Sequence, residues 1–390
     1  MRFLHTADWH LGRIFQGVHL TEDQAYVLDQ LADIVKDTRP DAVVIAGDVY
    51  DRAVPPSQAV RLFDDVMARM VRGLDVPVLV IAGNHDGPER VDYGSRLLEH
   101  RGLHVRGLLR PDLEPVILHD EHGPVAFSLL PFAEPAVVRE TLPEVSEPTG
   151  PLSHGAALGR MVGAARARLP EGVRAVAVAH AAMIGAFETE SERPLWIAAS
   201  GYAEAEVFRG FSYAALGHYH TPQTLAEGAS RVEYAGSLLK YSFAEADTAK
   251  SVTLVDLDAR GLAHTERILL RPRHDVRCVS GAFESLLDAL PEGVSERDYL
   301  RITLVDKEPV LDAMARLRRV YPNCLHVEQP RLYQPASEVR ARKDQLELDD
   351  TTLFSAFFED MAGEPITDAE KQCFADVVDA LDRRTRERAA

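Results

Sequence analysis

Residues 76–86 read VPVLVIAGNHD, an apolar run that ends in a glycine followed by three polar side chains, Asn84, His85 and Asp86. A short run of this kind, rich in valine and isoleucine and closed by a glycine, is typical of a buried strand. Other short apolar runs in the first 220 residues are also followed by polar residues, directly or after one glycine. These runs are Arg2–Ala7, Ala42–Ala46, Ala175–Ala179 and Tyr213–Leu216. We therefore expect a set of buried strands that end in polar loops.

Helical patterns separate the predicted strands near the start of the chain. Residues 21–38 and 57–71 each place their apolar residues on one helical face, and Thr21 with Gln24 has the form of a capping box. Strand–helix alternation predicts an α/β (α+β) fold, here a sheet sandwich flanked by helices. Near residues 125–130 and 251–257 the hydrophobic period shortens to two, which indicates hairpin strands.

The remaining chain has a different organisation. Residues 1–270 are expected to form the main domain, and residues 271–330 alternate strand and helix patterns as a small α+β domain would. Residues 331–349 are polar and predict a linker. Residues 350–390 predict a pair of helices, the second of which begins with a capping box at Thr367 and Glu370.

The polar loops contain side chains that bind metal ions. Functional sites of open α/β sheets form at the carboxyl ends of strands, where such loops meet. Carboxylate, imidazole and amide ligands without a thiolate suit Mn²⁺, Fe²⁺ or Zn²⁺. Each motif alone is weak evidence for a metal site, because Asp after Gly is common in turns. Their repetition after successive strands is stronger evidence. The candidate ligands are Asp8, His10, Asp48, Asn84, His180, His218 and His220. This set is too large for one ion and predicts two divalent ions that share Asp48.

Composition limits the other possibilities. The chain has 390 residues, 61 Asp+Glu against 43 Lys+Arg, and a net charge of −18. Its three cysteines show no paired spacing, which favours a reducing cytoplasm without disulfides. We find no run of about 18 apolar residues that would span a membrane, and no secretory signal. The acidic charge taken alone argues against a nucleic-acid partner, because such proteins usually present a basic surface.

The ordered motifs nevertheless resemble those of one superfamily. Asp-x-His, Gly-Asp, Gly-Asn-His-Asp, His and Gly-His-x-His follow in the order found in the calcineurin-like metallophosphoesterases. The flanking sequence is more specific and resembles bacterial DNA-repair nucleases of that superfamily along almost the whole chain. It includes Arg2–His10, Gly47–Pro56, Ser191–Leu195, Phe211–His220 and Tyr234–Leu239.

The resemblance implies a role for each candidate residue. The first metal would be held by Asp8, His10, Asp48 and His220, and the second by Asp48, Asn84, His180 and His218. His85 would face the scissile phosphate as a catalytic group, and Asp86 would orient His85 by accepting its other N–H. Some relatives carry a second active-site histidine where this chain has Asp51. The role of Asp51 is therefore left open between facing solvent and pairing with Arg52.

The resemblance also implies an activity and partners. The expected enzyme is a nuclease dependent on two metal ions, Mn²⁺ first and Mg²⁺ or another divalent ion as options. It would have 3′→5′ exonuclease activity on duplex ends and endonuclease activity at hairpins or blocked ends. Residues 350–390 would dock an SMC-like ATPase, and residues 271–330 would guide DNA. A homodimer within a heterotetramer, a cytoplasmic, nucleoid-associated location and no membrane contact are implied as well.

Three questions stay open at this point. The stretch Gly47–Arg52 also fits the Gly-Asp-x-x-Asp-Arg of protein phosphatases, so a phosphatase or a cyclic-nucleotide phosphodiesterase remains possible. Tyr241 and Phe243 could stack on a base or pack in the core, of which packing is favoured. The segment from Ser191 could form part of the substrate cleft or a plain surface loop. An acidic chain of this family should bind DNA weakly without its partner.

Overall fold

The computed structural model describes residues 1–144, 150–189, 191–192, 202–228 and 230–330, together with 354–355, 358, 366–367 and 370–374. The chain divides into two compact units. The first contains Met1–Ser280, Glu284–Ile302 and Asp312–Val327, and the second contains Gly281–Phe283, Thr303–Leu311 and Glu328–Ala390. Among the described residues, no helix has the length and apolar character needed to cross a membrane.

The first unit is built on two six-stranded sheets. In one sheet, β1, β4, β5 and β6 run parallel, while β13 pairs with β1 and β14 with β13 in antiparallel fashion. Its strand order is β14 (Ala263–Leu269), β13 (Ser251–Leu257), β1 (Arg2–Thr6), β4 (Ala42–Ala46), β5 (Val78–Ile81) and β6 (Leu103–Arg106).

The second sheet also has a parallel centre. Strands β8, β9, β10 and β12 run parallel, and β7 and β11 close the two edges as antiparallel strands. Its strand order is β11 (Gln223–Ala226), β12 (Arg231–Tyr234), β10 (Tyr213–Gly217), β9 (Arg174–His180), β8 (Gly123–Leu130) and β7 (Val116–Asp120).

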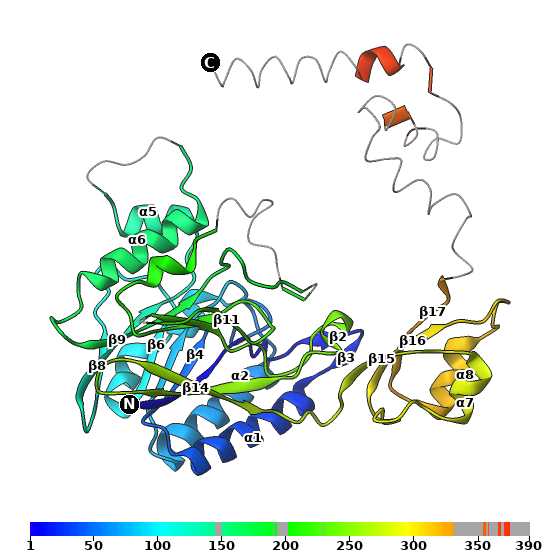
Figure 1. The fold of residues 1–390 in the computed structure, drawn as a ribbon, viewed down its shortest axis with the longest axis horizontal. Coiled ribbons are helices and arrows are strands. Elements are labelled where there is room, and N and C mark those ends of the chain that lie inside the picture. Colours follow the sequence, from blue (N-terminus) through cyan, green and yellow to red (C-terminus); the bar gives the residue numbers. More distant parts are fainter. Residues whose placement is uncertain are drawn as a thin grey trace. The chain divides into compact units, whose positions relative to one another are not determined.

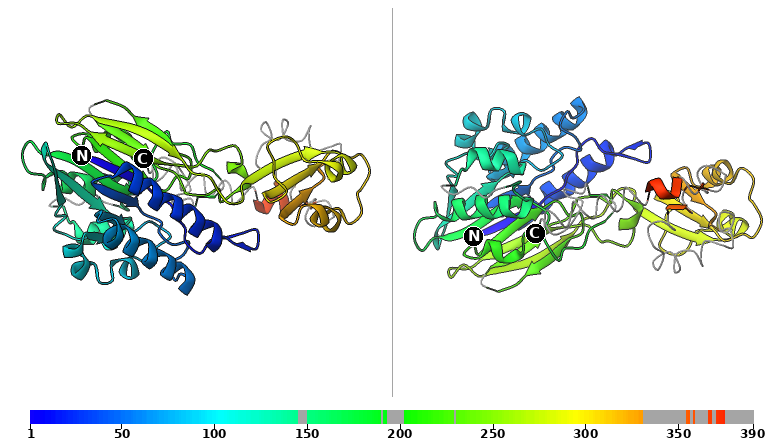
Figure 2. Two further views of the ribbon diagram at one scale, coloured as in Figure 1. Left: turned by 90° about the horizontal axis from the view of Figure 1, so that it is seen from below. Right: turned by 90° about the horizontal axis from the view of Figure 1, so that it is seen from above.

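The two sheets pack face to face and helices cover their outer faces (Figures 1 and 2). Between the sheets, the ring of Phe3 lies 5.5 Å from that of Phe127 and 5.6 Å from that of Tyr213, both edge-on. Helices α1 (Thr21–Thr38) and α2 (Ser57–Met67) bury apolar side chains against the first sheet. Helices α5 (Pro135–Thr141) and α6 (His154–Arg166) do the same on the second. The sandwich flanked by helices that the sequence predicts is confirmed.

The remaining elements are short. They are the ribbon β2 (Ile14–Phe15) and β3 (Val18–His19), the π-helical turn η1 (Ala68–Gly73), helices α3 (Pro88–Asp92) and α4 (Ser95–Leu98), and the 3₁₀ turns η2 (Glu99–Arg101), η4 (Ala205–Phe208) and η5 (Phe243–Glu245). After β14 follow β15 (Val276–Gly281), α7 (Phe283–Asp288), β16 (Tyr299–Leu304), α8 (Ala313–Val320) and β17 (Cys324–Glu328), and β15, β16 and β17 form a third sheet.

Most predicted elements are present with small shifts at their ends. The helix expected over residues 57–71 ends at Met67 and continues as η1. The capping box expected at Thr21 is wrong, because Leu20 occupies the cap position and no side chain caps the helix. The box at Thr367 is confirmed, since Glu370 accepts from the Thr367 backbone N–H at 2.9 Å. The predicted linker, residues 331–349, lies outside the described residues.

Candidate metal centre

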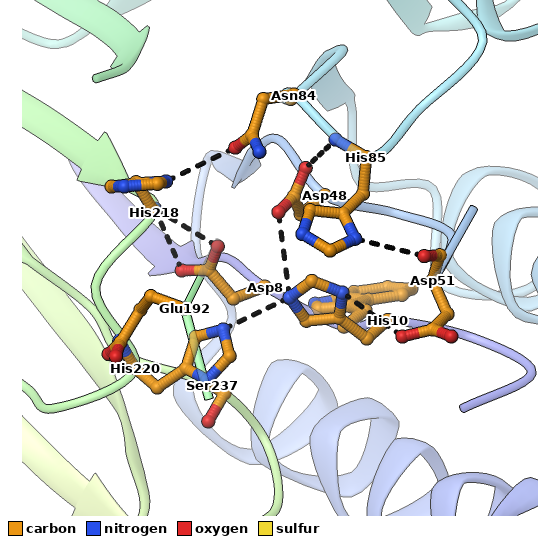
Figure 3. A network of polar contacts seen from close by, with 12 residues as sticks. Asp8, His10, Asp48, Asp51, Asn84, His85, Glu192, His218, His220 and Ser237 are labelled. Atoms are coloured by element: carbon orange, nitrogen blue, oxygen red, sulfur yellow. Dashed lines mark hydrogen bonds and ion pairs between the residues drawn. The ribbon is translucent and has the colours of Figure 1, made fainter. Parts of the chain in front are cut away.

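The loops that follow five strands meet in one place, and Figure 3 shows side chains from the loops after β1, β4, β5 and β10. Strands β1, β4 and β5 bring candidate ligands from the first sheet, and β9 and β10 bring theirs from the second. Backbone hydrogen bonds join neighbouring loops: the Asp8 N–H donates to the Gly47 carbonyl at 3.0 Å and the His10 N–H to the Asp48 carbonyl at 2.9 Å. The side chains converge because they follow neighbouring strands, as the sequence predicts.

Four of these residues have a strained backbone. The φ angle is 54° at Asp8, 45° at His10, 49° at Asp48 and 118° at His218. Residues with a Cβ rarely adopt such angles, each of which costs roughly 1–3 kcal/mol, and they gather at functional sites where the surrounding structure holds them. The conformation lets an otherwise extended chain turn its side chains toward one point.

Glycines allow the loops of the two sheets to come this close. A Cβ at Gly217 would lie 2.0 Å from the Ala46 carbonyl oxygen, and a Cβ at Gly83 would lie 2.2 Å from Asp48 Oδ1. Both distances are far below any van der Waals contact. The glycines of the Gly-His-x-His and Gly-Asn-His-Asp motifs are therefore required by packing.

One group of ligand atoms gathers around His180. Its Nδ1 lies 2.9 Å from the Ala46 carbonyl oxygen, which can only accept, so Nδ1 carries the proton and Nε2 presents a lone pair. That Nε2 lies 2.9 Å from Asn84 Oδ1 and 3.6 Å from Asp48 Oδ2. The Asn84 oxygen also lies 3.1 Å from His218 Nδ1. Several lone pairs thus face one another, an arrangement that a cation would satisfy.

A second group gathers around His10. Its Nε2 lies 3.0 Å from His220 Nε2 and 3.5 Å from Asp48 Oδ2, while its Nδ1 faces Asp51 Oδ1 at 3.7 Å. His220 Nδ1 lies 2.6 Å from Ser191 Oγ, whereas His10 Nδ1 is buried and makes no hydrogen bond to any described residue. Asp8 also belongs here, since one ligand atom each of Asp8, His10 and His220 lies within 4.8 Å of the others. Asp48 therefore lies beside both groups.

The charge state of these residues fits divalent cations. Burial, and then the neighbouring imidazoles, hold the pKa of His10 and of His218 well below the usual value, so both rings are neutral and can donate a lone pair. Burial and the nearby Asp48 raise the pKa of Asp8 well above that of an ordinary carboxyl. Paired carboxylates buried in this way need positive charge beside them.

His85 lies at the mouth of the centre, but Asp86 does not orient it. Nδ1 of His85 lies 2.9 Å from the Asp51 carbonyl oxygen, and its backbone N–H donates to Asp48 Oδ1 at 2.9 Å. The Asp86 carboxylate accepts backbone N–H groups of Val49, Tyr50 and Gly83 at 2.8–3.1 Å. The expected role of Asp86 toward His85 is therefore wrong: Asp86 fixes the two loops, and a backbone carbonyl orients the ring.

The surroundings of Asp51 and Tyr241 differ in part from expectation. The Asp51 carboxylate pairs with Arg13 at 2.9 Å, not with Arg52 as considered, and its side chain is partly exposed to solvent. Tyr241 and Phe243 are buried, which confirms core packing. The Tyr241 ring lies 5.4 Å from the ring of His10 and 5.6 Å from that of His220.

Supporting residues were missed by sequence reasoning. Gln24 donates to the His10 carbonyl at 2.7 Å and accepts from the Gly12 N–H at 3.0 Å, so it holds the first loop. A polar residue on the buried face of a predicted helix was the available signal. Glu192 accepts from the His220 N–H at 2.8 Å, and buried Lys250 donates to the His220 carbonyl at 2.7 Å. The part of the segment from Ser191 that the structure describes thus contacts the centre.

Comparisons with known proteins find similar families and a similar nuclease subunit. A family model described as calcineurin-like phosphoesterase matches residues 1–137, and one described as the type 5 capsule protein repressor C-terminal domain (SbcD_C) matches residues 272–362. The chain is 29% identical over 370 residues to the SbcD subunit of nuclease SbcCD from Staphylococcus epidermidis, a match that covers 95% of this chain and 96% of that protein.

Two solved structures are also similar to the chain. TT1561 of Thermus thermophilus is 14% identical with a TM-score of 0.39, and the match covers 68% of this chain and 98% of that one. A dimetal phosphatase from Danio rerio is 15% identical with a TM-score of 0.41, and the match covers 70% of this chain and 97% of that one.

Proposed function

The chain belongs to the SbcD-type calcineurin-like phosphoesterases, and from that premise we propose that it is a metal-dependent nuclease, the hydrolytic subunit of a complex with an SbcC-type ATPase. The observation that carries the proposal is the position of Asp48 between two groups of inward-facing ligand atoms. Its Oδ2 lies 3.5 Å from His10 Nε2 and 3.6 Å from His180 Nε2. One carboxylate in reach of both groups is what two adjacent cations require.

The proposed ligands divide into two sets that share this carboxylate. Asp8, His10, Asp48 and His220 would hold the first cation, and Asp48, Asn84, His180 and His218 the second. Oxygen and imidazole donors without thiolate suit Mn²⁺, Fe²⁺ or Zn²⁺. The similarity to a nuclease subunit makes Mn²⁺ our first choice, with Mg²⁺ or another divalent ion as alternatives. Such a pair would supply an activated water and neutralise charge that develops on a phosphodiester.

His85 would act on the leaving group. Because the Asp51 carbonyl oxygen holds Nδ1 at 2.9 Å, the ring keeps Nε2 for the substrate. From there a protonated Nε2 can pass its proton to the departing sugar oxygen. Asp86 serves by holding the loop that presents His85.

The substrate of this proposal is the end or hairpin of duplex DNA. The enzyme would act as a 3′→5′ exonuclease on duplex ends and as an endonuclease at hairpins or blocked ends, in the cytoplasm and near the nucleoid. The relative in Staphylococcus epidermidis is named a nuclease subunit, which supports this choice. The Gly-Asp-x-x-Asp-Arg pattern of residues 47–52 favours the alternative of a phosphatase or cyclic-nucleotide phosphodiesterase.

A direct comparison of substrates tests the function. With Mn²⁺, the wild-type chain should cleave an end-labelled hairpin oligonucleotide and act weakly on p-nitrophenyl phosphate, because a monoester offers none of the DNA contacts. EDTA should abolish cleavage, and so should Asp48→Asn, which removes the shared carboxylate. Rapid hydrolysis of p-nitrophenyl phosphate or of a cyclic nucleotide, with the hairpin intact, would support the alternative.

We further propose that residues 350–390 dock the ATPase and that the chain forms a homodimer within a heterotetramer. In the second unit, the rings of Phe354 and Phe374 stack with centroids 4.0 Å apart, so aromatic side chains of both predicted helices meet. In the first unit, Tyr93 and Leu97 near α3 and α4 are 88% and 81% exposed. Apolar side chains of this size on a surface support contact with another chain.

Truncation after Arg342 tests the docking proposal. The shortened chain should retain hairpin cleavage and lose co-purification with an SbcC-type ATPase, because the candidate docking helices are gone. Phe354→Asp in the full-length chain should weaken co-purification in the same direction, since it places a charge in the stacked pair. Co-purification of the shortened chain at the wild-type level would contradict the assignment of residues 350–390.

A further inference from the structure

We propose that Arg13 binds a phosphate group that flanks the scissile phosphodiester, and that Asp51 positions the Arg13 guanidinium for it. The inference rests on the proposed nuclease function and adds a specific contact with the DNA strand. It begins from the charged pair of Arg13 and Asp51, which lies at the edge of the metal centre and outside the two proposed ligand sets.

The backbone of Arg13 is fixed relative to the proposed ligands. Arg13 follows β1 three residues after His10, and its N–H donates to the His10 carbonyl oxygen at 3.0 Å. The Leu20 N–H donates to the Arg13 carbonyl oxygen at 3.0 Å, which ties the start of this ribbon to its end. The guanidinium is thus attached to the centre through a short, hydrogen-bonded segment.

The side chain is held on two sides. Nη1 donates to Asp51 Oδ1 at 2.9 Å, and the guanidinium carbon lies 5.5 Å from the centroid of the Tyr241 ring. A cation over an aromatic face at this distance is attracted to it. Tyr241 is itself packed against His10 and His220. These contacts fix the guanidinium beside the centre.

The pair remains accessible to a ligand. The side chains of Arg13 and Asp51 are 19% and 21% exposed, whereas those of His10 and Asp48 are nearly inaccessible. One carboxylate oxygen occupies one of the five guanidinium N–H groups, so donors are left for a second anion. A guanidinium fork matches the oxygens of a phosphate group.

The position of the pair selects a flanking phosphate over the scissile one. His10 faces Asp48 with Nε2 and Asp51 with Nδ1, so its imidazole ring lies between the Asp51 carboxylate, which pairs with Arg13, and the shared carboxylate of Asp48. Figure 3 shows His10, Asp48 and Asp51. The scissile phosphate would lie between the cations and His85. A strand extending from there past His85 would bring its next phosphate toward Arg13.

Asp51 contacts both His85 and Arg13. Its carbonyl oxygen orients His85, and its carboxylate orients Arg13. The same residue therefore sets the spacing between the proposed proton donor and the proposed phosphate ligand.

A charge-removal cycle on enzyme and substrate tests the contact. Hairpin oligonucleotides are prepared with one uncharged methylphosphonate at each successive position next to the cleavage site. Arg13→Gln should raise the KM for the unmodified hairpin about tenfold, with a smaller change in kcat, and reduce the salt dependence of binding by about one unit of slope. Arg13→Lys should recover part of the loss, because it restores the charge but not the fork.

The decisive result is non-additivity at one position. At one flanking phosphate, the methylphosphonate should impair the wild-type enzyme as much as Arg13→Gln does, and should impair Arg13→Gln no further. The loss of activity caused by Arg13→Gln should be at least fivefold larger on the hairpin than on bis(p-nitrophenyl) phosphate, because that diester has a single phosphate. Arg209→Gln is the matched control: Arg209 is an exposed arginine paired with Glu206 near the start of β10, away from the centre.

Each contrary outcome has a separate meaning. Additive losses at every methylphosphonate position, or equal losses on hairpin and small diester, would overturn the role of Arg13 while the nuclease function stands. Loss of bound metal from Arg13→Gln would show a structural role and overturn it as well. Failure of the wild-type chain to cleave any oligonucleotide would overturn the nuclease proposal, and this inference with it.

Discussion

His85→Gln lowers the kcat for hairpin cleavage by roughly 10²- to 10⁴-fold, the range expected when a general acid is removed. Glutamine can still donate a hydrogen bond, but it cannot deliver a proton to the departing oxygen. The His85 backbone N–H, which donates to Asp48 Oδ1 at 2.9 Å, is unaffected by the substitution. Metal content should therefore equal that of the wild type.

Measured together, metal content and single-turnover rate separate chemistry from metal binding. Asp48→Asn is the matched control, since it removes the shared carboxylate and should lose both metal and cleavage. A wild-type rate in His85→Gln would refute the proposed proton transfer. Loss of metal from His85→Gln would instead make His85 a metal ligand.

Lys250→Met lowers the free energy of unfolding by about 3–5 kcal/mol, the cost of leaving one member of a buried ion pair without its partner. Lys250 and Glu245 are fully buried and in direct contact. The Lys250 ammonium also donates to Ser237 Oγ at 2.9 Å and to the His220 carbonyl oxygen at 2.7 Å. Burial lowers the pKa of Lys250, while Glu245 opposes that effect.

Chemical denaturation of the metal-free chain measures this cost. Lys36→Met on the exposed side of α1 is the control and should change stability by no more than about 0.5 kcal/mol. Adding Glu245→Leu to Lys250→Met should restore a large part of the loss, because the uncompensated charge is then removed. A single variant as stable as the wild type would show that Glu245 finds another partner.

Much of the framework could be predicted from the sequence because its signals are local. The period of apolar residues marked α1 with both ends correct, and runs of valine and isoleucine marked β4 and β5. Polar residues at the ends of parallel strands must meet, so the candidate ligands could be gathered without knowledge of side-chain geometry.

The errors concern side chains whose partners depend on three-dimensional position. Asp86 follows His85 in the sequence, yet its carboxylate turns to Val49, Tyr50 and Gly83 instead. Gln24 occupies the capping-box position but bonds the loop after β1. Arg13 pairs with Asp51 across 38 positions of sequence. Spacing along the chain does not determine such pairings.

The proposed ligands come from both sheets of the sandwich, and Asp48 of the first lies against His180 of the second. The distances between the proposed ligands therefore depend on how far apart the two sheets lie. Protein interiors are close-packed and transmit small displacements. A substitution between the sheets, such as one that alters the contact of Phe3 with Phe127, would therefore change the distances between the proposed metal ligands. The affinity for metal ions therefore depends on how the side chains between the two sheets pack.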